Sequence, residues 1–91
     1  MKADKTSVSH KVKIAKGQLE AVLKMIEEDQ YCVDISTQLL AAQALLKKAN
    51  QEILEAHVRC CVSTAVKSGN PEESESKVDE ALKLMEKMMK G

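Results

Sequence analysis

The stretch from Tyr31 to Cys61 constrains the fold more than any other part of the chain. It contains neither glycine nor proline, the two residues that most often interrupt helices. Apolar side chains recur along it every three or four positions, which is the spacing of an amphipathic helix. We therefore expect one long helix over about 32–67, roughly 50 Å long at 1.5 Å per residue.

Composition favours an all-α fold. The chain has 91 residues, 31% of them charged, with 1% aromatic residues and a single proline. Its core must therefore consist of aliphatic side chains and methionine, which suit packed helices. We expect a single helical domain over 1–91, with helices over about 7–29, 32–67 and 71–90.

The first helix has an apolar seam with alternating spacings of four and three residues. Its members are Val8, Val12, Ala15, Leu19, Val22 and Ile26. Ser7 or Ser9 is the expected N-cap. Gly17 interrupts the pattern, either as a tolerated surface glycine or as a point of close approach by another helix or a partner. Before the third helix, Gly69 suits a helix end, and Asn70, Pro71 and Glu73 suit a helix start.

The long helix is apolar on more than one side. One seam contains Ile35, Leu39, Ala42, Leu46, Ala49, Ile53, Ala56 and Cys60, and a second contains Val33, Leu40, Ala44, Leu54, Val58, Val62 and Ala65. One partner helix from the same chain cannot cover both seams. We expect two helical hairpins to associate as an antiparallel four-helix-bundle dimer.

Cysteine and histidine gather at the two ends of the long helix. His57 and Cys61 are four positions apart, so they face the same way on a helix. Thiolate and imidazole suit Cu(I) or Zn(II). Cys32 is too far along the helix to join them within one chain, but an antiparallel partner would bring its own Cys32 there. Three donors suit Cu(I), whereas Zn(II) prefers four and would be a non-native occupant.

These patterns leave other interpretations open. Cysteine is more often a buried packing residue than a ligand, and Cys60 falls on the apolar seam. Lysines on the first helix and in the middle of the second can contact DNA phosphates or can simply form a solvated face. The sequence contains no phosphate-binding loop, catalytic triad or helix-turn-helix pattern.

Cellular context follows from charge and cysteine usage. The three cysteines are an odd number, and no apolar signal-peptide core follows Met1. No apolar run approaches the length of a membrane span. We expect a cytoplasmic protein with reduced thiols. The formal net charge of zero means that any contact with nucleic acid depends on local basic clusters.

Taken together, these motifs resemble the small helical metal-sensitive repressors typified by the copper-sensing repressor CsoR. The similarity is carried by Lys16-Gly17-Gln18, by the segment from Met25 to Ile35 that includes Tyr31-Cys32-Val33-Asp34, by Lys48-Ala49-Asn50, and by His57-Val58-Arg59-Cys60-Cys61. The resemblance implies three-helix chains that form antiparallel dimers and flat tetramers. It also implies that the metal-free protein binds operator DNA and releases the DNA when the effector binds.

The resemblance also implies roles for particular residues. Cys32, His57 and Cys61 match the copper branch, which holds Cu(I) across the dimer interface, with Tyr31 and Glu80 as supporting residues. The DNA-contacting positions correspond to Lys11, Lys13, Lys16 and Lys48, where relatives commonly carry arginine. A persulfide-responsive repressor using Cys32 and Cys61 is one alternative, although that branch lacks the histidine. A helical metal-buffering protein without DNA binding is the other.

Overall fold

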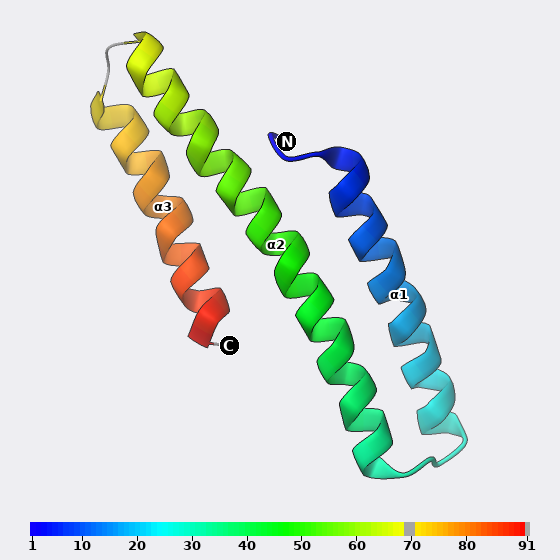
Figure 1. Ribbon diagram of the computed structural model, residues 1–91. Helices are drawn as coiled ribbons and strands as arrows, with labels where there is room; N and C mark the ends of the chain where they lie inside the picture. Colours follow the sequence, from blue (N-terminus) through cyan, green and yellow to red (C-terminus); the bar gives the residue numbers. More distant parts are fainter. Residues whose placement is uncertain (69–70, 91) are drawn as a thin grey trace. The chain divides into compact units, whose positions relative to one another are not determined.

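Three helices account for nearly all of the chain. The computed structural model describes residues 1–68 and 71–90, but not the side chains at positions 61, 62, 64–68, 71, 73 and 74. The helices are α1 (Lys5–Glu27), α2 (Cys32–Ser68) and α3 (Pro71–Lys90), as Figure 1 shows. No strand occurs in the part of the chain that is described. The prediction of an all-α, three-helix chain is therefore confirmed.

The start of α1 differs from the prediction. The helix begins at Lys5, which places Asp4 at the N-cap position and makes the expected caps, Ser7 and Ser9, helical residues. Within the helix the Lys11 ammonium donates a hydrogen bond to the Ser7 hydroxyl at 2.8 Å. Asp4 is as good a cap as serine, and capping there adds a turn to the helix.

By their internal contacts, the residues form two compact units that divide within α2. One unit is Thr6–Ala49, and the other combines Met1–Lys5 with Asn50–Gly91. In the first unit, α1 and the beginning of α2 run antiparallel beside each other (Figure 1). In the second unit, α3 runs back along the end of α2 (Figure 1). None of the described helices is long and apolar enough to cross a membrane.

A short connection joins α1 to α2 and fixes where α2 starts. The Gln30 amide donates to the Met25 carbonyl at 3.0 Å, and the Asp29 amide donates to the Ile26 carbonyl at 3.1 Å. This pair of bonds is the Schellman helix end, and Asp29 takes its left-handed position with φ of 50°. Immediately afterwards, the Tyr31 carbonyl accepts the first hydrogen bonds of α2 from the amides of Asp34 and Ile35 at 3.0 and 3.2 Å.

The apolar seam of α1 divides into a buried half and an exposed half. Every seventh residue is buried, namely Val8, Ala15 and Val22. The residues between them face outward, with Val12 45%, Leu19 40% and Ile26 51% exposed. One chain therefore buries only part of a seam that the sequence presents as continuous.

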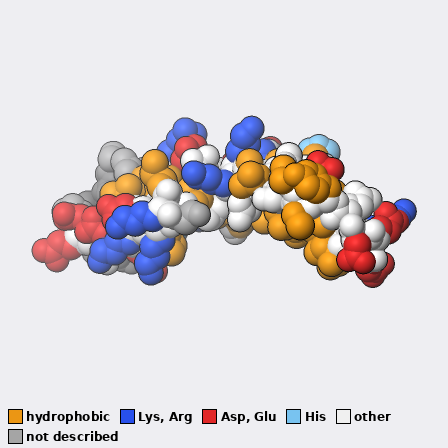
Figure 2. Space-filling model, turned by 90° about the horizontal axis from the view of Figure 1, so that it is seen from below, with side chains coloured by type: hydrophobic (Ala, Val, Ile, Leu, Met, Phe, Trp, Pro, Cys, Tyr) orange, Lys and Arg blue, Asp and Glu red, His pale blue; other side chains and the backbone are white. Residues whose placement is uncertain are grey.

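The first part of α2 divides in the same way. Ala42 and Ala49 are buried, whereas Leu39 and Leu46 are 40% and 42% exposed. At about 100° per residue, the exposed leucines lie on the same side of this antiparallel pair as the exposed residues of α1. Hydrophobic side chains are visible at the surface in the right half of Figure 2, where α1 and the start of α2 lie. We call Val12, Leu19, Ile26, Leu39 and Leu46 the outer apolar face.

The second unit has a smaller core. Leu54 on α2 and Ala81 on α3 are its buried side chains among the residues described. The apolar residues Ile53, Val78 and Met85 are half-buried around them. Gly69 and Asn70, predicted to end α2 and to cap α3, lie outside the described residues, but α3 does begin at Pro71.

Candidate functional site

Cys32 is the first residue of α2 and carries an exposed, free thiol. Its position follows from the backbone bonds of the connection, since Tyr31 accepts the first helical hydrogen bonds and so acts as the N-cap. The Tyr31 side chain is 68% exposed. Burial in a core, the common use of a cysteine, does not apply to Cys32 in this chain.

His57 lies in a groove between α2 and α3. The groove has a volume of about 440 Å³ and also contains Glu80, the carboxylate proposed on α3 to support the histidine. Apolar side chains form most of its remaining wall, namely Ile53, Leu54, Ala81 and Leu84. His57 is half-buried and Glu80 is exposed. Packing of α3 on α2 thus brings both side chains to one groove.

Cys61 follows His57 by one turn of α2, because the helix continues without a break to Ser68. The condition for both residues to face the same way is therefore met by the backbone. The Cys61 side chain is outside the described part of the structure. Its neighbour Cys60 is half-buried.

The described residues of a single chain hold no cluster of three or more histidine, cysteine or acidic side chains arranged to bind a metal. Thiolate and imidazole donors nevertheless have the chemistry that Cu(I) requires. Cys32 belongs to one compact unit, and His57 and Cys61 belong to the other. The predicted donors are therefore separated along α2: Cys32 lies at its start, and His57 and Cys61 lie near its end.

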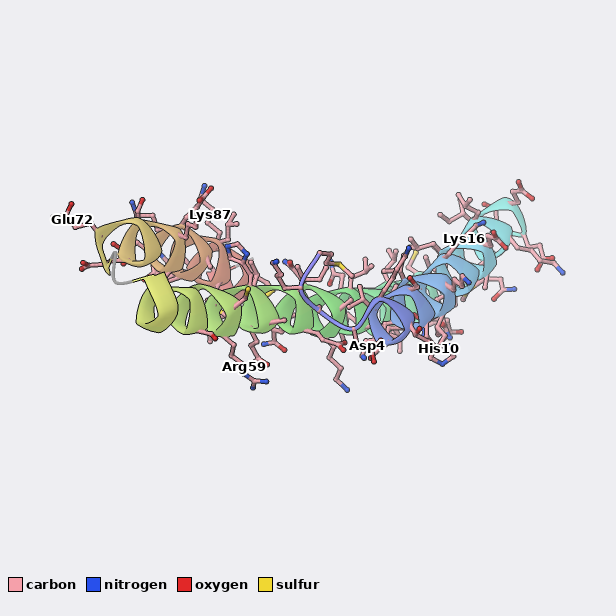
Figure 3. All side chains as sticks on the ribbon, turned by 90° about the horizontal axis from the view of Figure 1, so that it is seen from above. Asp4, His10, Lys16, Arg59, Glu72 and Lys87 are labelled. Atoms are coloured by element: carbon pink, nitrogen blue, oxygen red, sulfur yellow. The ribbon has the colours of Figure 1, made fainter. Side chains whose placement is uncertain are left out.

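The predicted DNA-contacting lysines differ in their surroundings. Lys13, Lys16 and Lys48 are exposed, whereas Lys11 is half-buried and donates to Ser7. Lys16 and His10 project from different sides of α1 (Figure 3). Of the lysines on α1, Lys13 and Lys16 are therefore better placed than Lys11 to reach a phosphate.

Two residues near the histidine had no signal in the sequence. Met1 and Lys2 contribute to the wall of the groove that contains His57 and Glu80. A short polar segment before a helix normally suggests a loose end. Only the folded chain reveals that this segment lies against the last part of α2 and α3.

A family description matches almost the whole chain. The model of the family "Metal-sensitive transcriptional repressor" covers residues 4–87. The copper-sensing transcriptional repressor CsoR of Bacillus subtilis (strain 168) is 36% identical over 88 residues, which span 97% of this chain and 84% of that protein.

Two solved structures of transcriptional regulators are similar to this chain. The crystal structure of the copper-sensing repressor CsoR with Cu(I) from Geobacillus thermodenitrificans NG80-2 has a TM-score of 0.76 and 33% identity, covering 87% of this chain and 82% of that one. The nickel-responsive transcriptional regulator InrS has a higher TM-score of 0.85 at 22% identity, covering 93% of this chain and 96% of that one. At that identity the likeness to InrS concerns the fold alone.

The order of the three helices and the similarity to known repressors agree. The relatives are regulators of transcription and not enzymes. The chain therefore belongs to the family of metal-sensitive transcriptional repressors.

Proposed function

We propose that the chain is a Cu(I)-responsive repressor, which binds operator DNA without metal and releases it when Cu(I) is bound. The observation that carries the proposal is the placement of His57 and Glu80 in one groove, with Cys61 one turn further along α2. Identity of 36% to a protein named as copper-sensing supports copper as the effector. The single histidine between two cysteines favours a soft ion over nickel.

The proposed site needs two chains. Cys32 from one chain completes the donor set formed by His57 and Cys61 of another, with Tyr31 and Glu80 nearby. The outer apolar face supports this association, because one chain leaves those large side chains exposed to water. We propose that two such faces pack as an antiparallel four-helix bundle, and that dimers pair as tetramers.

Each residue has a distinct part in the proposed mechanism. The thiolates of Cys32 and Cys61 and the imidazole of His57 would hold the ion, and the bonds to a bound Cu(I) would link the two chains. Glu80, located in the groove of His57, would orient the imidazole when the ion is bound, as carboxylates commonly do for metal-binding histidines. Because His57 is on α2 and Glu80 on α3, a change in imidazole position alters how those helices pack and thereby the DNA-binding form.

A joint titration tests the proposal. The DNA upstream of the gene for this chain is labelled with fluorescein, and binding is followed by anisotropy while Cu(I) is added from a chelator-buffered solution. DNA affinity should fall about 5- to 150-fold, the usual size of an allosteric coupling. DNA must weaken Cu(I) binding by the same factor. Full Cu(I) binding with unchanged DNA affinity contradicts the mechanism.

The persulfide alternative is distinguished by mass spectrometry. A chain that responds to sulfur species through Cys32 and Cys61 yields an intersubunit crosslink after persulfide treatment, whereas the proposed copper sensor needs none for DNA release. His57 has no part in the crosslink, so its presence in the groove favours the metal.

A further inference from the structure

Gly17 lies in the middle of α1 and is exposed. A Cβ atom added there meets no heavy atom of the described residues within 4 Å. Glycine within a helix is destabilising relative to alanine, because the unfolded chain loses more freedom on folding. The packing of this chain therefore does not explain why the helix carries glycine at this position.

Gly17 also faces away from the surfaces where helices pack. At about 100° per residue, it lies about 160° around α1 from buried Ala15, and about 160° from Leu19 on the outer apolar face. Neither the contact of α1 with α2 nor the proposed dimer reaches it. A body that approaches Gly17 must come from the opposite side of α1.

The charge on that side is mostly positive. Lys13 is one turn before Gly17, Lys16 is its immediate neighbour, and Lys24 lies two turns after it; all three are exposed. Glu20 is the carboxylate on this stretch, and α1 as a whole has five lysines and two glutamates. Such a surface is complementary to a polyanion.

We propose that Gly17 is the point at which the sugar–phosphate backbone of bound DNA lies against α1. This inference rests on the proposed function, because it assumes that the chain binds DNA. The missing side chain allows a phosphate to come close to the helix surface, within reach of Lys13 and Lys16 together. A side chain at position 17 would hold the phosphate further out and weaken both interactions.

The substitutions Gly17→Ala and Gly17→Leu in the full-length chain test the inference. The midpoint of thermal unfolding of Gly17→Ala should rise by about 2–8 °C, because alanine favours the helix and the space is open. Affinity for the labelled upstream duplex should nevertheless fall at least about tenfold, and further for the leucine variant. The salt dependence of binding should fall as well, since fewer phosphates are then neutralised by lysine. Affinity and stability thus change in opposite directions, which simple damage to the fold would not produce.

Asp29→Gly serves as the matched control. Asp29 has a left-handed backbone conformation, which glycine adopts more easily, so this substitution should also stabilise the pair formed by α1 and α2. It adds no atoms to α1. Its DNA affinity should equal that of the unmodified chain. If Gly17→Ala binds the duplex as tightly as the unmodified chain, or melts at a lower temperature, the inference is overturned. If the unmodified chain itself does not bind the duplex, the proposed DNA-binding function is wrong and this inference falls with it.

Discussion

Ala15 and Leu19 lie one turn apart on the same apolar seam of α1, yet Ala15 is 1% exposed and Leu19 is 40% exposed. At this pair of positions the chain thus buries the small residue and leaves the large one outside. The same division separates Ala42 from Leu46 on α2. Large apolar side chains aligned on one face are typical of an interaction surface, and we propose that a second copy of the chain covers this one.

Glutamate at Leu19 or Leu46 should therefore disrupt self-association. Burying one leucine contributes about 1.5–3 kcal/mol, and a symmetric dimer contains each position twice, so the dissociation constant should rise at least about 100-fold. Sedimentation equilibrium measures the change. Thr37→Glu is the control, because Thr37 is exposed, lies on neither apolar seam and is about 180° around α2 from Leu46. An unchanged mass for Leu19→Glu and Leu46→Glu would show that this face is not the interface.

His57→Ala should separate metal binding from DNA release. The two cysteines can still hold Cu(I) with two soft donors, so some binding remains. The link from the site to Glu80 and α3 is removed, so adding Cu(I) should change DNA affinity less than about twofold, against the usual 5- to 150-fold coupling. Competition with a Cu(I) chelator and anisotropy measure the two effects. A variant that releases DNA normally would rule out the histidine as the coupling residue.

Glu80→Gln should weaken the coupling between Cu(I) binding and DNA release, but less than His57→Ala does. The amide keeps the size of the side chain but removes the charge that supports the imidazole, and loss of such a partner typically costs about 10–100-fold in affinity or activity. We expect reduced Cu(I) coupling with unchanged apo DNA binding. Glu72→Gln, at an exposed position in the first turn of α3, is the matched control (Figure 3). Equal behaviour of the two variants would remove Glu80 from the site.

Replacing the lysines of α1 one at a time should separate phosphate-binding lysines from the one held within the helix. Lys13→Ala and Lys16→Ala should each lower the slope of log affinity against log salt by about one, because one fewer phosphate is neutralised. Lys11→Ala should have a smaller effect on that slope, because the Lys11 ammonium donates to Ser7 within the helix. Anisotropy titrations across a range of salt concentrations give the slopes. Equal slopes for all three variants would contradict this ranking.

Asp29→Gly should stabilise the protein. Asp29 has a φ of 50°, where any side chain adds strain that glycine avoids. The free energy of unfolding in urea should rise by about 0.5–1 kcal/mol. Glu28→Gly is the control, since Glu28 is not among the residues with positive φ and glycine there should destabilise the helix end. A fall in stability for Asp29→Gly would indicate that the carboxylate makes a compensating contact.

Much of the fold could be predicted from local sequence. The three helices follow from apolar spacing and from the absence of glycine and proline between Tyr31 and Cys61. The predicted end of α1 at about residue 29 differs from the observed end at Glu27, because the Schellman bonds of Asp29 and Gln30 end the helix there. An aspartate in the left-handed position gives a weaker signal than the usual glycine.

The candidate site was predictable only in part. His57 and Cys61 share a helical face because of their spacing, which needs no tertiary information. Glu80 required the resemblance, and its place in the groove of His57 depends on how α3 packs on α2. Met1 and Lys2 could not be connected to the groove from sequence, since nothing in a short polar segment specifies a distant contact.

The sequence alone determined which residues are helical and which lie on an apolar stripe, because helix periodicity is a local property. It did not determine which residues of the apolar stripe are buried within one chain and which stay exposed. That was decided by the tertiary structure, in which α1 and α2 pack through Ala15, Ala42 and Ala49 and leave Leu19 and Leu46 outside. Small residues allow close approach of two helices, so the larger side chains next to them remain exposed at the edge of the contact.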